Sequence, residues 1–597
     1  MLDIEWDPAD DDALLALGWR GEAYVDPVPQ AVLDELADER ITKVTFTKAD
    51  HRWCRLHGIE VNGPHHDVQV MAWMLGEAQD LDLDSVALRF AGIRMDKRLR
   101  RVGGRVLFRC DDGTEVPIGH APLDQLIAYN LRDVQATKDL YRTLVQELAD
   151  ADLLDLFLEE HVPFTDVLGR MEARGVPVDV PATIRLRDEI QGEIDKLVVE
   201  LRADADLPEA FNLGSNLQLA DYLYKKRFKL KGRVPVDEIP DGFDVAKLGR
   251  VWAHGHYELA GRGFKVRART DKGAPSVAGP KLRVHYGEDP WVQKLLELKQ
   301  RETIVSTFLN VFPEVAVGGR LYGRFNQTGT VTGRLSSSGP NMQNIPARSD
   351  LGRKVRELFT LPAGEGHLIH ADYSQLEPRL SAHWSQDPVM LDLFRNDEDI
   401  YLVTARAVYG RMVERDDVER AHAKTFVLGM SYLAGAKTLA IMLTENGFPT
   451  TTDRAEEILR ELKRLYRVFF AYADHVVKQS ESMGFVPTLM RERRIIPATR
   501  GGHWKESSLS PTQAINAQIQ GSAADVVQRV MVRAHQQFPQ LRLLAQVHDE
   551  LLWEADEAPP PFTLHRLQKL AERGHGFRLT VPLKFEPKIV GSWAEGK

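Results

Sequence analysis

Two strand-like apolar runs that end in carboxylates constrain the fold of this chain most. The first run, His367 to Ala371, leads directly into Asp372. In the second, LLAQVHDELLWEA, the polar pair His548 and Asp549 interrupts an apolar alternation. Such an interruption predicts a strand, a tight turn and a second strand.

Carboxylates flanked by apolar strands need partners, because an unpaired buried charge is costly. A divalent cation prefers hard oxygen ligands, so one interpretation is a metal that bridges Asp372 and Asp549. The other interpretation is two surface carboxylates. Two ions about 3.5–4 Å apart could clamp the attacking and leaving oxygens of a phosphoryl transfer.

A second pattern is a stripe of residues spaced four apart. Arg420, Lys424, Leu428 and Tyr432 form a slowly drifting line on a helix. Two cations at one end and an aromatic ring at the other suit a nucleotide, with the cations on the triphosphate. A solvated Arg/Lys face is the alternative.

Composition bounds the class of protein. The 597 residues are 43% apolar and 27% charged, which is typical of globular chains. Cys54 and Cys110 are too few for a disulfide scaffold or a thiolate zinc site. With no apolar run of about 18 residues and no signal-peptide pattern, we expect a cytoplasmic protein without a membrane span.

The charge balance, 77 basic against 87 acidic residues, argues against nucleic acid, because phosphate binding needs cations. Three segments are nevertheless locally basic: 225–233, 262–272 and 491–500. Solvated loops are the alternative for any single one of them.

Hydrophobic periodicity changes along the chain. The first 150 residues mix short strands, such as 44–46, with helices, such as 126–144, as in an α/β domain. We then expect helices around 190–201 and 291–308, with loops and short helices between about 203 and 289. Strands and turns follow from about 320, and a long helical region follows from about 388. Within that region one helix has an apolar stripe of Ile458, Leu462, Leu465 and Phe469. Thr451 or Thr452 is the expected cap of that helix.

Five segments in order resemble the signatures of family A (DNA polymerase I-like) DNA polymerases: TGRLSSSGPNMQNIP, DYSQLEPRL, RAHAKTFVLGMSY, INAQIQGSAAD and QVHDELLWE. FNLGSNLQL also resembles the thumb of that family. The resemblance implies a right-hand polymerase fold, with an α+β palm and helical fingers and thumb. The implied boundaries are 151–325 for the thumb and the start of the polymerase domain, 326–386 for palm, 387–510 for fingers and 511–597 for palm again.

The resemblance also implies roles for single residues. Asp372 and Asp549 would hold two Mg²⁺ ions per active site, with the Tyr373 carbonyl as a further ligand and Glu550 as an auxiliary carboxylate. Lys424 would contact the triphosphate and act as general acid toward pyrophosphate. The other nucleotide contacts would be Arg420, Gln375, Glu377, Tyr401, Leu428 and Tyr432, with Glu377 as the steric gate against ribose. The DNA contacts would be Arg334, Asn341, Gln343, Arg379, Asn516, Gln520 and His548.

Residues 1–150 are similar to the DnaQ-like (RNase H-like) 3′–5′ exonuclease domain. Asp3 and Glu5 share one face of a strand, because side chains alternate with a period of two. Tyr129 and Asp133 lie four apart on a helix. The resemblance implies metal binding by Asp3, Glu5, Asp50 and Asp133, with Tyr129 orienting the attacking water, and HDVQVMAWML, with Asp67, matches a further stretch.

The resemblance therefore implies a replicative DNA polymerase with proofreading, acting as a monomer on primer–template DNA and deoxynucleotides. A processivity factor, a helicase or a primase are further candidate partners. The absence of a 5′-nuclease domain resembles phage enzymes. A single-subunit RNA polymerase and a DNA-binding relic with inactive sites are the alternatives, and Glu377 argues against the first.

Five positions depart from the family pattern. Leu428 stands where the family usually has Phe or Tyr, Leu433 where Gly is common, Tyr401 where His is frequent, and Phe46 where Asn is usual. Pro378 is tolerable only if a helix begins near it. None of these removes a metal ligand, so we expect altered kinetics rather than inactivity.

Overall fold

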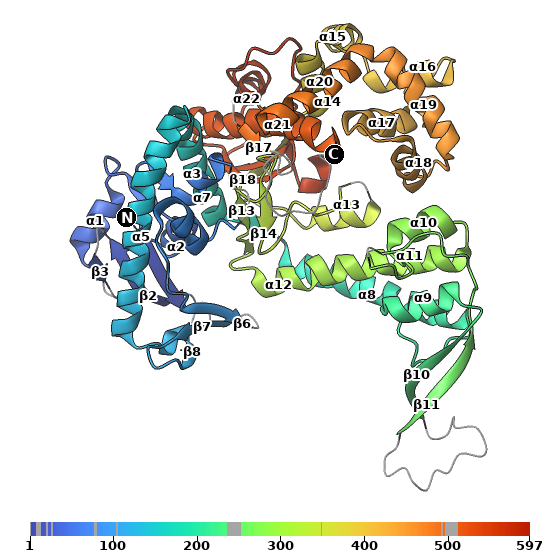
Figure 1. Cartoon of the computed structure of the whole chain (residues 1–597), viewed down its shortest axis with the longest axis horizontal. Coiled ribbons are helices and arrows are strands. Elements are labelled where there is room, and N and C mark those ends of the chain that lie inside the picture. The colour runs from blue at the N-terminus through green and yellow to red at the C-terminus, as the bar shows by residue number, and fades with distance from the viewer. Residues whose placement is uncertain are drawn as a thin grey trace.

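The structure is a computed structural model. It describes residues 2–7, 13–19, 22–24, 28–76, 80–102, 105–235, 252–270, 272–347, 349–490, 493–495 and 511–596. Figure 1 shows the N-terminal lobe in blue at one side and a two-stranded ribbon that projects from the opposite side. Within these residues, every helix is too short or too polar to cross a bilayer.

The N-terminal lobe is an α/β unit, as the sequence predicts. Its strands are β1 (Leu2–Asp7), β2 (Ala13–Trp19), β3 (Glu22–Tyr24), β4 (Lys43–Thr45), β5 (His65–Asp67), β6 (Leu99–Val102), β7 (Arg105–Arg109) and β8 (Glu115–Pro117). Its helices are α1 (Gln30–Ala37), α2 (Ala49–Leu56), α3 (Val68–Met74), α4 (Leu83–Val86) and α5 (Leu123–Asp150). The sheets are β1-β2-β3, β4-β5 and β6-β7-β8, and only β4-β5 is parallel. Helix α5 packs along β1, β2 and β4.

A helical arm follows. It contains α6 (Leu154–Leu156), α7 (Val162–Arg174), α8 (Val180–Ala203), α9 (Asn216–Tyr224), α10 (Gly279–Tyr286), α11 (Pro290–Ile304) and α12 (Val311–Val315). The predicted helices near 190–201 and 291–308 are confirmed, and they pack on each other through buried Ile190, Ile194 and Leu201. The Trp291 indole donates a hydrogen bond of 2.9 Å to the Leu201 carbonyl.

The expectation of only loops and short helices between 203 and 289 is wrong. β10 (Arg227–Pro235) and β11 (Trp252–Ala260) pair antiparallel along their whole length. The sequence RFKLKGRVP alternates cations with apolar residues at a period of two, which is a strand pattern. The density of glycine, proline and charge in this region obscured that period.

A four-stranded antiparallel sheet with order β18-β19-β15-β20 forms the centre of the molecule. Its strands are β18 (Arg542–Val547), β19 (Glu550–Ala555), β15 (His367–Asp372) and β20 (Lys588–Val590). The predicted hairpin and the predicted first strand are therefore both confirmed, and they are neighbours. The surrounding helices are α13 (Asp350–Glu357), α14 (Leu376–Ser385), α21 (Pro511–Gln537) and α22 (Pro561–Arg573).

Six further strands of the described residues are short and pair in twos. They are β9 (Val176–Pro177), β12 (Arg320–Leu321), β13 (Arg324–Asn326), β14 (Ser336–Ser338), β16 (Phe485–Pro487) and β17 (Arg493–Ile495). β9 pairs with β12, β13 with β14 and β16 with β17. This region of strands and turns agrees with the expectation from about residue 320.

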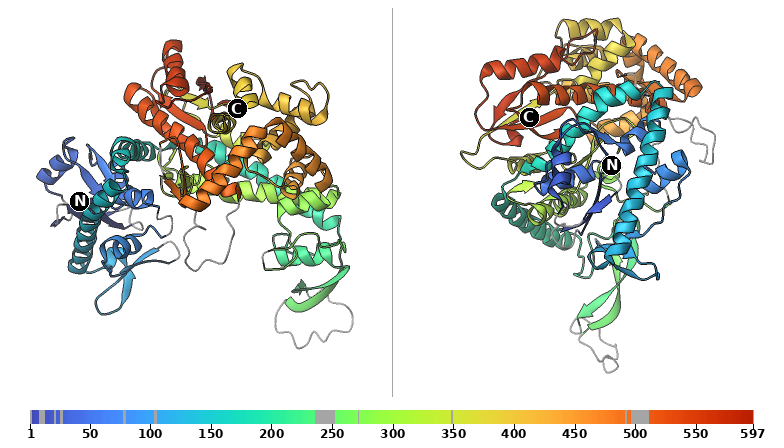
Figure 2. Two further views of the ribbon diagram at one scale, coloured as in Figure 1. Left: turned by 45° about the horizontal axis from the view of Figure 1, so that its top comes forward. Right: turned by 90° about the vertical axis from the view of Figure 1, so that its left-hand side faces the viewer.

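A helical cluster with its own hydrophobic core follows the first strand of the four-stranded sheet in the chain and is coloured from yellow to orange in Figure 2. Its helices are α15 (Pro388–Arg395), α16 (Ile400–Tyr409), α17 (Val418–Ser431), α18 (Ala436–Glu445), α19 (Thr452–Leu465) and α20 (Arg467–Met483). The Thr451 side chain caps α19 by accepting from the Arg454 amide. The predicted stripe is divided, because the helix breaks at Tyr466 and Phe469 belongs to α20.

Candidate active site

The β18–β19 turn and the end of β15 bring two predicted metal ligands together. In the register of the sheet, Asp372 faces Glu550, the residue after Asp549. The Tyr373 amide donates a 3.2 Å hydrogen bond to the Asp549 carbonyl. His548 holds the turn with a left-handed φ of 60° and its side chain is exposed.

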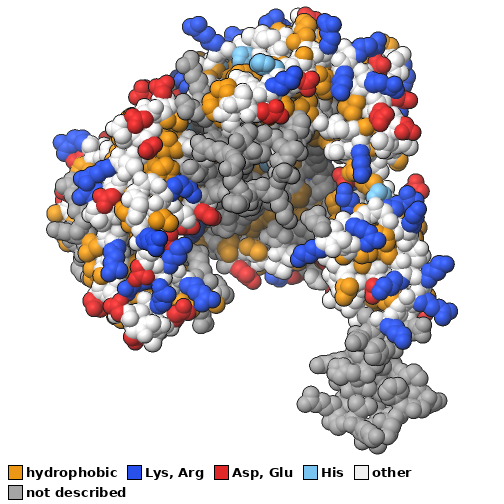
Figure 3. Space-filling view, viewed as in Figure 1, with side chains coloured by type: hydrophobic (Ala, Val, Ile, Leu, Met, Phe, Trp, Pro, Cys, Tyr) orange, Lys and Arg blue, Asp and Glu red, His pale blue; other side chains and the backbone are white. Residues whose placement is uncertain are grey.

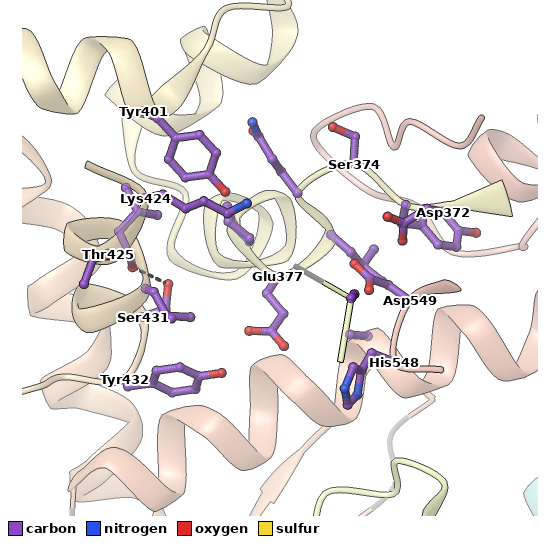
Figure 4. Close-up of a pocket in the computed structure, with 18 of the residues that line it drawn as sticks. Asp372, Ser374, Glu377, Tyr401, Lys424, Thr425, Ser431, Tyr432, His548 and Asp549 are labelled. Carbon is purple, nitrogen blue, oxygen red and sulfur yellow. Dashed lines mark hydrogen bonds between the residues drawn. The ribbon is translucent and has the colours of Figure 1, made fainter. Parts of the chain in front are cut away.

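Both carboxylates line one cavity of about 1130 Å³. Twelve of the residues predicted for the polymerase site share this cavity: Arg334, Asp372, Tyr373, Gln375, Glu377, Tyr401, Arg420, Lys424, Leu428, Tyr432, His548 and Asp549. Figure 4 shows Asp372 and Asp549 on one side, with Lys424, Tyr401 and Tyr432 facing them and Glu377 between.

Helix α17 carries the predicted stripe. Arg420, Lys424 and Leu428 lie along it, and Tyr432 caps its end. Lys424 and Leu428 are exposed to the cavity, and the Gln520 amide donates to the Tyr432 hydroxyl at 3.3 Å. The four-residue spacing thus presents two cations, an apolar side chain and a ring to one space.

Arg420 has a partner that the sequence analysis missed. Its Nε and Nη2 atoms both lie 2.8 Å from Asp399 Oδ2, and its guanidinium lies 5.9 Å from the Tyr401 ring centroid. Asp399 also caps α16 by accepting from the Tyr401 amide at 2.9 Å. An aspartate just before a helix is a recognisable capping signal, but its pairing with Arg420 depends on how α16 and α17 pack.

The predicted steric gate is fixed by an ion pair. Glu377, in the first turn of α14, pairs with Arg334 from the segment before β14. Burial and the nearby Glu377 charge raise the pKa of Tyr432. Gln375 precedes α14 with φ 57°, and Pro378 is the third residue of that helix, a position that tolerates proline.

The donor set fits a divalent cation. Two carboxylates and the Tyr373 main-chain carbonyl are hard oxygen ligands. Among the residues that the structure describes, no group of three or more His, Cys, Asp or Glu side chains gathers as a metal cage. Mg²⁺ is usually bound through one or two carboxylates together with substrate phosphates, and the pair Asp372 and Asp549 matches that number of carboxylates.

Glu550 does not line the cavity. Its carboxylate is 1% exposed and accepts from Arg356 Nη1 at 2.9 Å and from His370 Nε2 at 2.9 Å, as well as from the Trp593 indole. The Arg356 guanidinium lies 4.4 Å from the Trp593 ring centroid. Glu550 thus forms a buried ion pair with Arg356, and its role as an auxiliary carboxylate stays a prediction.

Arg379, predicted as a DNA contact, is buried in the structure. It is 3% exposed, donates to the Ser374 and Pro582 carbonyls at 3.0 and 2.7 Å, and packs over the Phe394 ring. Its guanidinium group thus binds the backbone two residues after Asp372, and the side chain faces protein rather than solvent.

The remaining predicted DNA contacts lie outside the cavity lining. The Gln343 side chain donates to the Gln546 carbonyl at 3.1 Å, and its backbone amide donates to Asn341. Asn516 and Gln520 are half-buried on α21.

The N-terminal candidate site draws on three elements. Asp3 and Glu5 lie on β1, which contacts α2 and α5; their side chains lie outside the described ones. Asp50 is buried in the first turn of α2, and Asp133 is buried on α5. Burial raises the pKa of Asp133 to about 6, against the opposing effect of a hydrogen bond from Tyr129.

A further carboxylate of this lobe is held by backbone amides. Asp67 caps α3, accepting from the Val70 amide at 3.1 Å and from the Lys48 amide at 2.8 Å. Burial raises its pKa to about 6. Phe46, at the position where Asn is usual, packs half-buried against the core of the lobe.

Comparison with known proteins decides the family. Residues 258–595 match DNA polymerase family A, and residues 14–149 match a 3′–5′ exonuclease family. The chain belongs to DNA polymerase family A.

Curated relatives of this family A chain include DNA polymerase I of Bacillus subtilis (strain 168). It is 30% identical over 559 residues, which cover 91% of this chain and 56% of that protein. The thermostable DNA polymerase I of Thermus filiformis is 33% identical over 468 residues, or 77% of this chain and 50% of that protein. The chain thus spans about half the length of the curated relatives it matches.

A solved structure agrees with the fold. The POL domain of Pol1 from M. smegmatis, in complex with DNA primer-template and dNTP, matches with a TM-score of 0.77 at 24% identity, covering 98% of this chain and 93% of that chain. The predicted fold class, an exonuclease domain followed by a family A polymerase domain, is confirmed.

Proposed function

We propose that this chain is a template-directed DNA polymerase that adds deoxynucleotides to a primer 3′ end and removes mismatched ends by 3′–5′ exonuclease action. The meeting of Asp372 and Asp549 in one cavity, facing Lys424 on α17, carries the proposal. Acidic metal ligands opposite a cation are the arrangement that phosphoryl transfer requires.

In the proposed reaction the primer 3′-hydroxyl attacks the α-phosphate of the deoxynucleotide and pyrophosphate leaves. Asp372, Asp549 and the Tyr373 carbonyl would hold two Mg²⁺ ions, whose charge would stabilise the attacking and leaving oxygens. Lys424 would bind the triphosphate and give a proton to pyrophosphate.

Arg420 would reach the triphosphate by exchanging its Asp399 partner for phosphate oxygens. The exchange replaces one anion with another, so the guanidinium stays neutralised throughout. Tyr432 would lie beside the templating base, with Leu428 against the incoming sugar.

Glu377 supports deoxynucleotides over the alternative of a single-subunit RNA polymerase. Because Arg334 holds this carboxylate in the cavity, its side chain would occupy the space of a ribose 2′-hydroxyl. Rates of deoxy- and ribonucleotide incorporation compare the two functions directly.

For the exonuclease, Asp3, Glu5, Asp50 and Asp133 would hold the metals, and Tyr129 would orient water. The boundaries 1–150, 151–325, 326–386, 387–510 and 511–597 are part of the proposal. So are a cytoplasmic location, a role in replication and primer–template DNA as partner. A phage origin and accessory replication partners stay predictions.

One gel tests both activities. Wild type, Asp549→Ala and Asp3→Ala are incubated with a primer that has a mismatched 3′ end, deoxynucleotides and Mg²⁺. We expect Asp549→Ala to lose extension by about a thousand-fold or more and to keep trimming, because a metal ligand contributes several kcal/mol to the transition state. Asp3→Ala should lose trimming only.

A wild type that binds the primer–template without extending it would contradict the proposal in favour of the DNA-binding relic. Loss of both activities in Asp549→Ala would contradict two separate sites.

A further inference from the structure

The exonuclease helix α2 is anchored outside its own lobe. Helix α2 contacts α7 (Val162–Arg174), which begins beyond the proposed exonuclease boundary, and the two lie side by side in Figure 1. Since Asp50 lies in the first turn of α2, whatever holds this helix also sets the position of Asp50.

Glu172 on α7 is the centre of the anchor. Its side chain is 1% exposed, and its Oε1 lies 2.7 Å from Lys48 Nζ. Its other oxygen, Oε2, lies 3.7 Å from Arg52 Nε. Lys48 comes two residues before Asp50 and Arg52 two residues after it, so one carboxylate holds α2 on both sides of the candidate metal ligand.

The same carboxylate reaches into the polymerase region. Glu172 Oε1 accepts a hydrogen bond of 2.6 Å from the Phe325 amide on β13. Arg52 also donates to the Tyr322 carbonyl at 2.9 Å. Glu172 therefore joins α2 of one lobe to β13 of the other.

The contacts of Glu172 depend on the position of α2. A buried carboxylate is costly unless cations and donors surround it, and an uncompensated buried charge is strongly destabilising. If α2 moved away, Glu172 would lose both Lys48 and Arg52. These contacts therefore favour one position of α2 against α7.

From these contacts we infer that Glu172 is a positioning residue of the exonuclease site, supplied by the polymerase domain. It holds Asp50 in place through Lys48 and Arg52, so the exonuclease site is complete only when the two domains are docked. The inference rests on the proposed exonuclease activity.

The test uses the full chain and the variant Glu172→Gln, which keeps shape and removes charge. We expect kcat for degradation of single-stranded DNA to fall about tenfold, as for other groups that orient ligands indirectly, with KM changed less than about twofold. Extension of a matched primer should stay within about twofold of wild type, which excludes general unfolding.

A double-mutant cycle tests the route. Because Glu172 acts partly through Lys48, the variant Lys48→Met should also lower kcat for trimming, and the double variant should lose less than the product of the two single losses. Asp84→Asn is the matched control, because it removes a carboxylate from a surface pair with Lys97 in the same lobe and should leave trimming unchanged.

Hydrogen exchange gives a readout that needs no activity. Amides of α2 should exchange faster in Glu172→Gln, while those of α5 stay unchanged. Unchanged kcat together with unchanged exchange in α2 would overturn the inference, and so would equal losses of extension and trimming. If the wild type failed to trim but Glu172→Gln still loosened α2, the exonuclease proposal would fail and the anchoring of α2 would stand.

Discussion

At the scale of one residue, the ionised carboxylate of Asp133 in the candidate exonuclease site destabilises the folded protein. Its carboxyl is buried on α5, and burial raises its pKa from 3.8 to about 6. The folded chain therefore holds a proton on this group more tightly than the unfolded chain does. The free energy of unfolding therefore decreases as the pH rises from 3.8 to about 6, and the decrease is complete above that pH.

Replacing Asp133 with Asn should stabilise the metal-free protein at neutral pH. We expect a gain of about 2–3 kcal/mol at pH 7.5, since each pKa unit corresponds to about 1.4 kcal/mol, and the gain should shrink as the pH falls through 6 toward 4. Thermal unfolding in chelator at several pH values measures it.

The control is Asp139→Asn, which changes a half-exposed carboxylate on the same helix. A gain for Asp133→Asn that did not depend on pH would show that ionisation is not its cause. Trimming should be lost in Asp133→Asn, so function and stability would move in opposite directions.

At the scale of an element, helix α17 ends at a backbone position that favours glycine. It ends in a Schellman motif, in which the Leu433 amide donates to the Met430 carbonyl at 2.9 Å and the Ala434 amide donates to the Gly429 carbonyl at 2.8 Å. The residue after the cap, Leu433, has φ 48°, a conformation in which glycine is favoured. The glycine that is common here in the family suits this left-handed conformation, whereas this chain has leucine.

At position 433 glycine should be more stable than alanine, which is the reverse of their usual order inside helices. We expect Leu433→Gly to be about 1 kcal/mol more stable than Leu433→Ala, because both remove the half-buried side chain and only glycine relieves the left-handed strain. Urea unfolding of both variants measures the difference.

At the exposed position Ala421 inside the same helix, glycine should instead cost about 1 kcal/mol. An alanine variant at 433 as stable as the glycine variant would mean that the backbone there carries no strain.

At the scale of the whole molecule, charge is unevenly distributed. The net charge is −10, yet Lys226, Arg227 and Lys229 are exposed where the ribbon begins, and Arg267 and Arg269 are exposed on the returning chain. Figure 3 shows Lys and Arg side chains on the lobe from which the ribbon projects. A local cation cluster on an acidic protein suits a polyanionic partner.

Replacing Lys226, Arg227 and Lys229 with Gln should weaken binding to primer–template DNA and flatten its salt dependence. Each lost phosphate contact lowers the slope of log Kd against log salt by about one. Titrations at several salt concentrations measure the slope.

The control removes equal charge from α19, through Arg460→Gln, Lys463→Gln and Arg464→Gln, all exposed. Equal slopes for the ribbon variant and the wild type would mean that the ribbon base does not contact phosphate.

The local features of this protein follow from residue order and spacing alone. Apolar runs predicted β15, β18 and β19, and the turn between the last two carries Asp549. The four-residue spacing put Arg420 and Lys424 on one helical line. Such features are predictable because backbone geometry alone relates neighbours along the chain to one face of an element.

Contacts between side chains of different elements depend on how the elements pack in the folded chain. Asp549 and Glu550 are adjacent in sequence. Asp549 lines the cavity, whereas Glu550 is buried against Arg356 and Trp593. The burial of Arg379 and the anchoring of α2 by Glu172 were likewise invisible in the sequence. The physical reason is that a charge finds its partner through packing, and packing is a property of the assembled elements rather than of residue spacing.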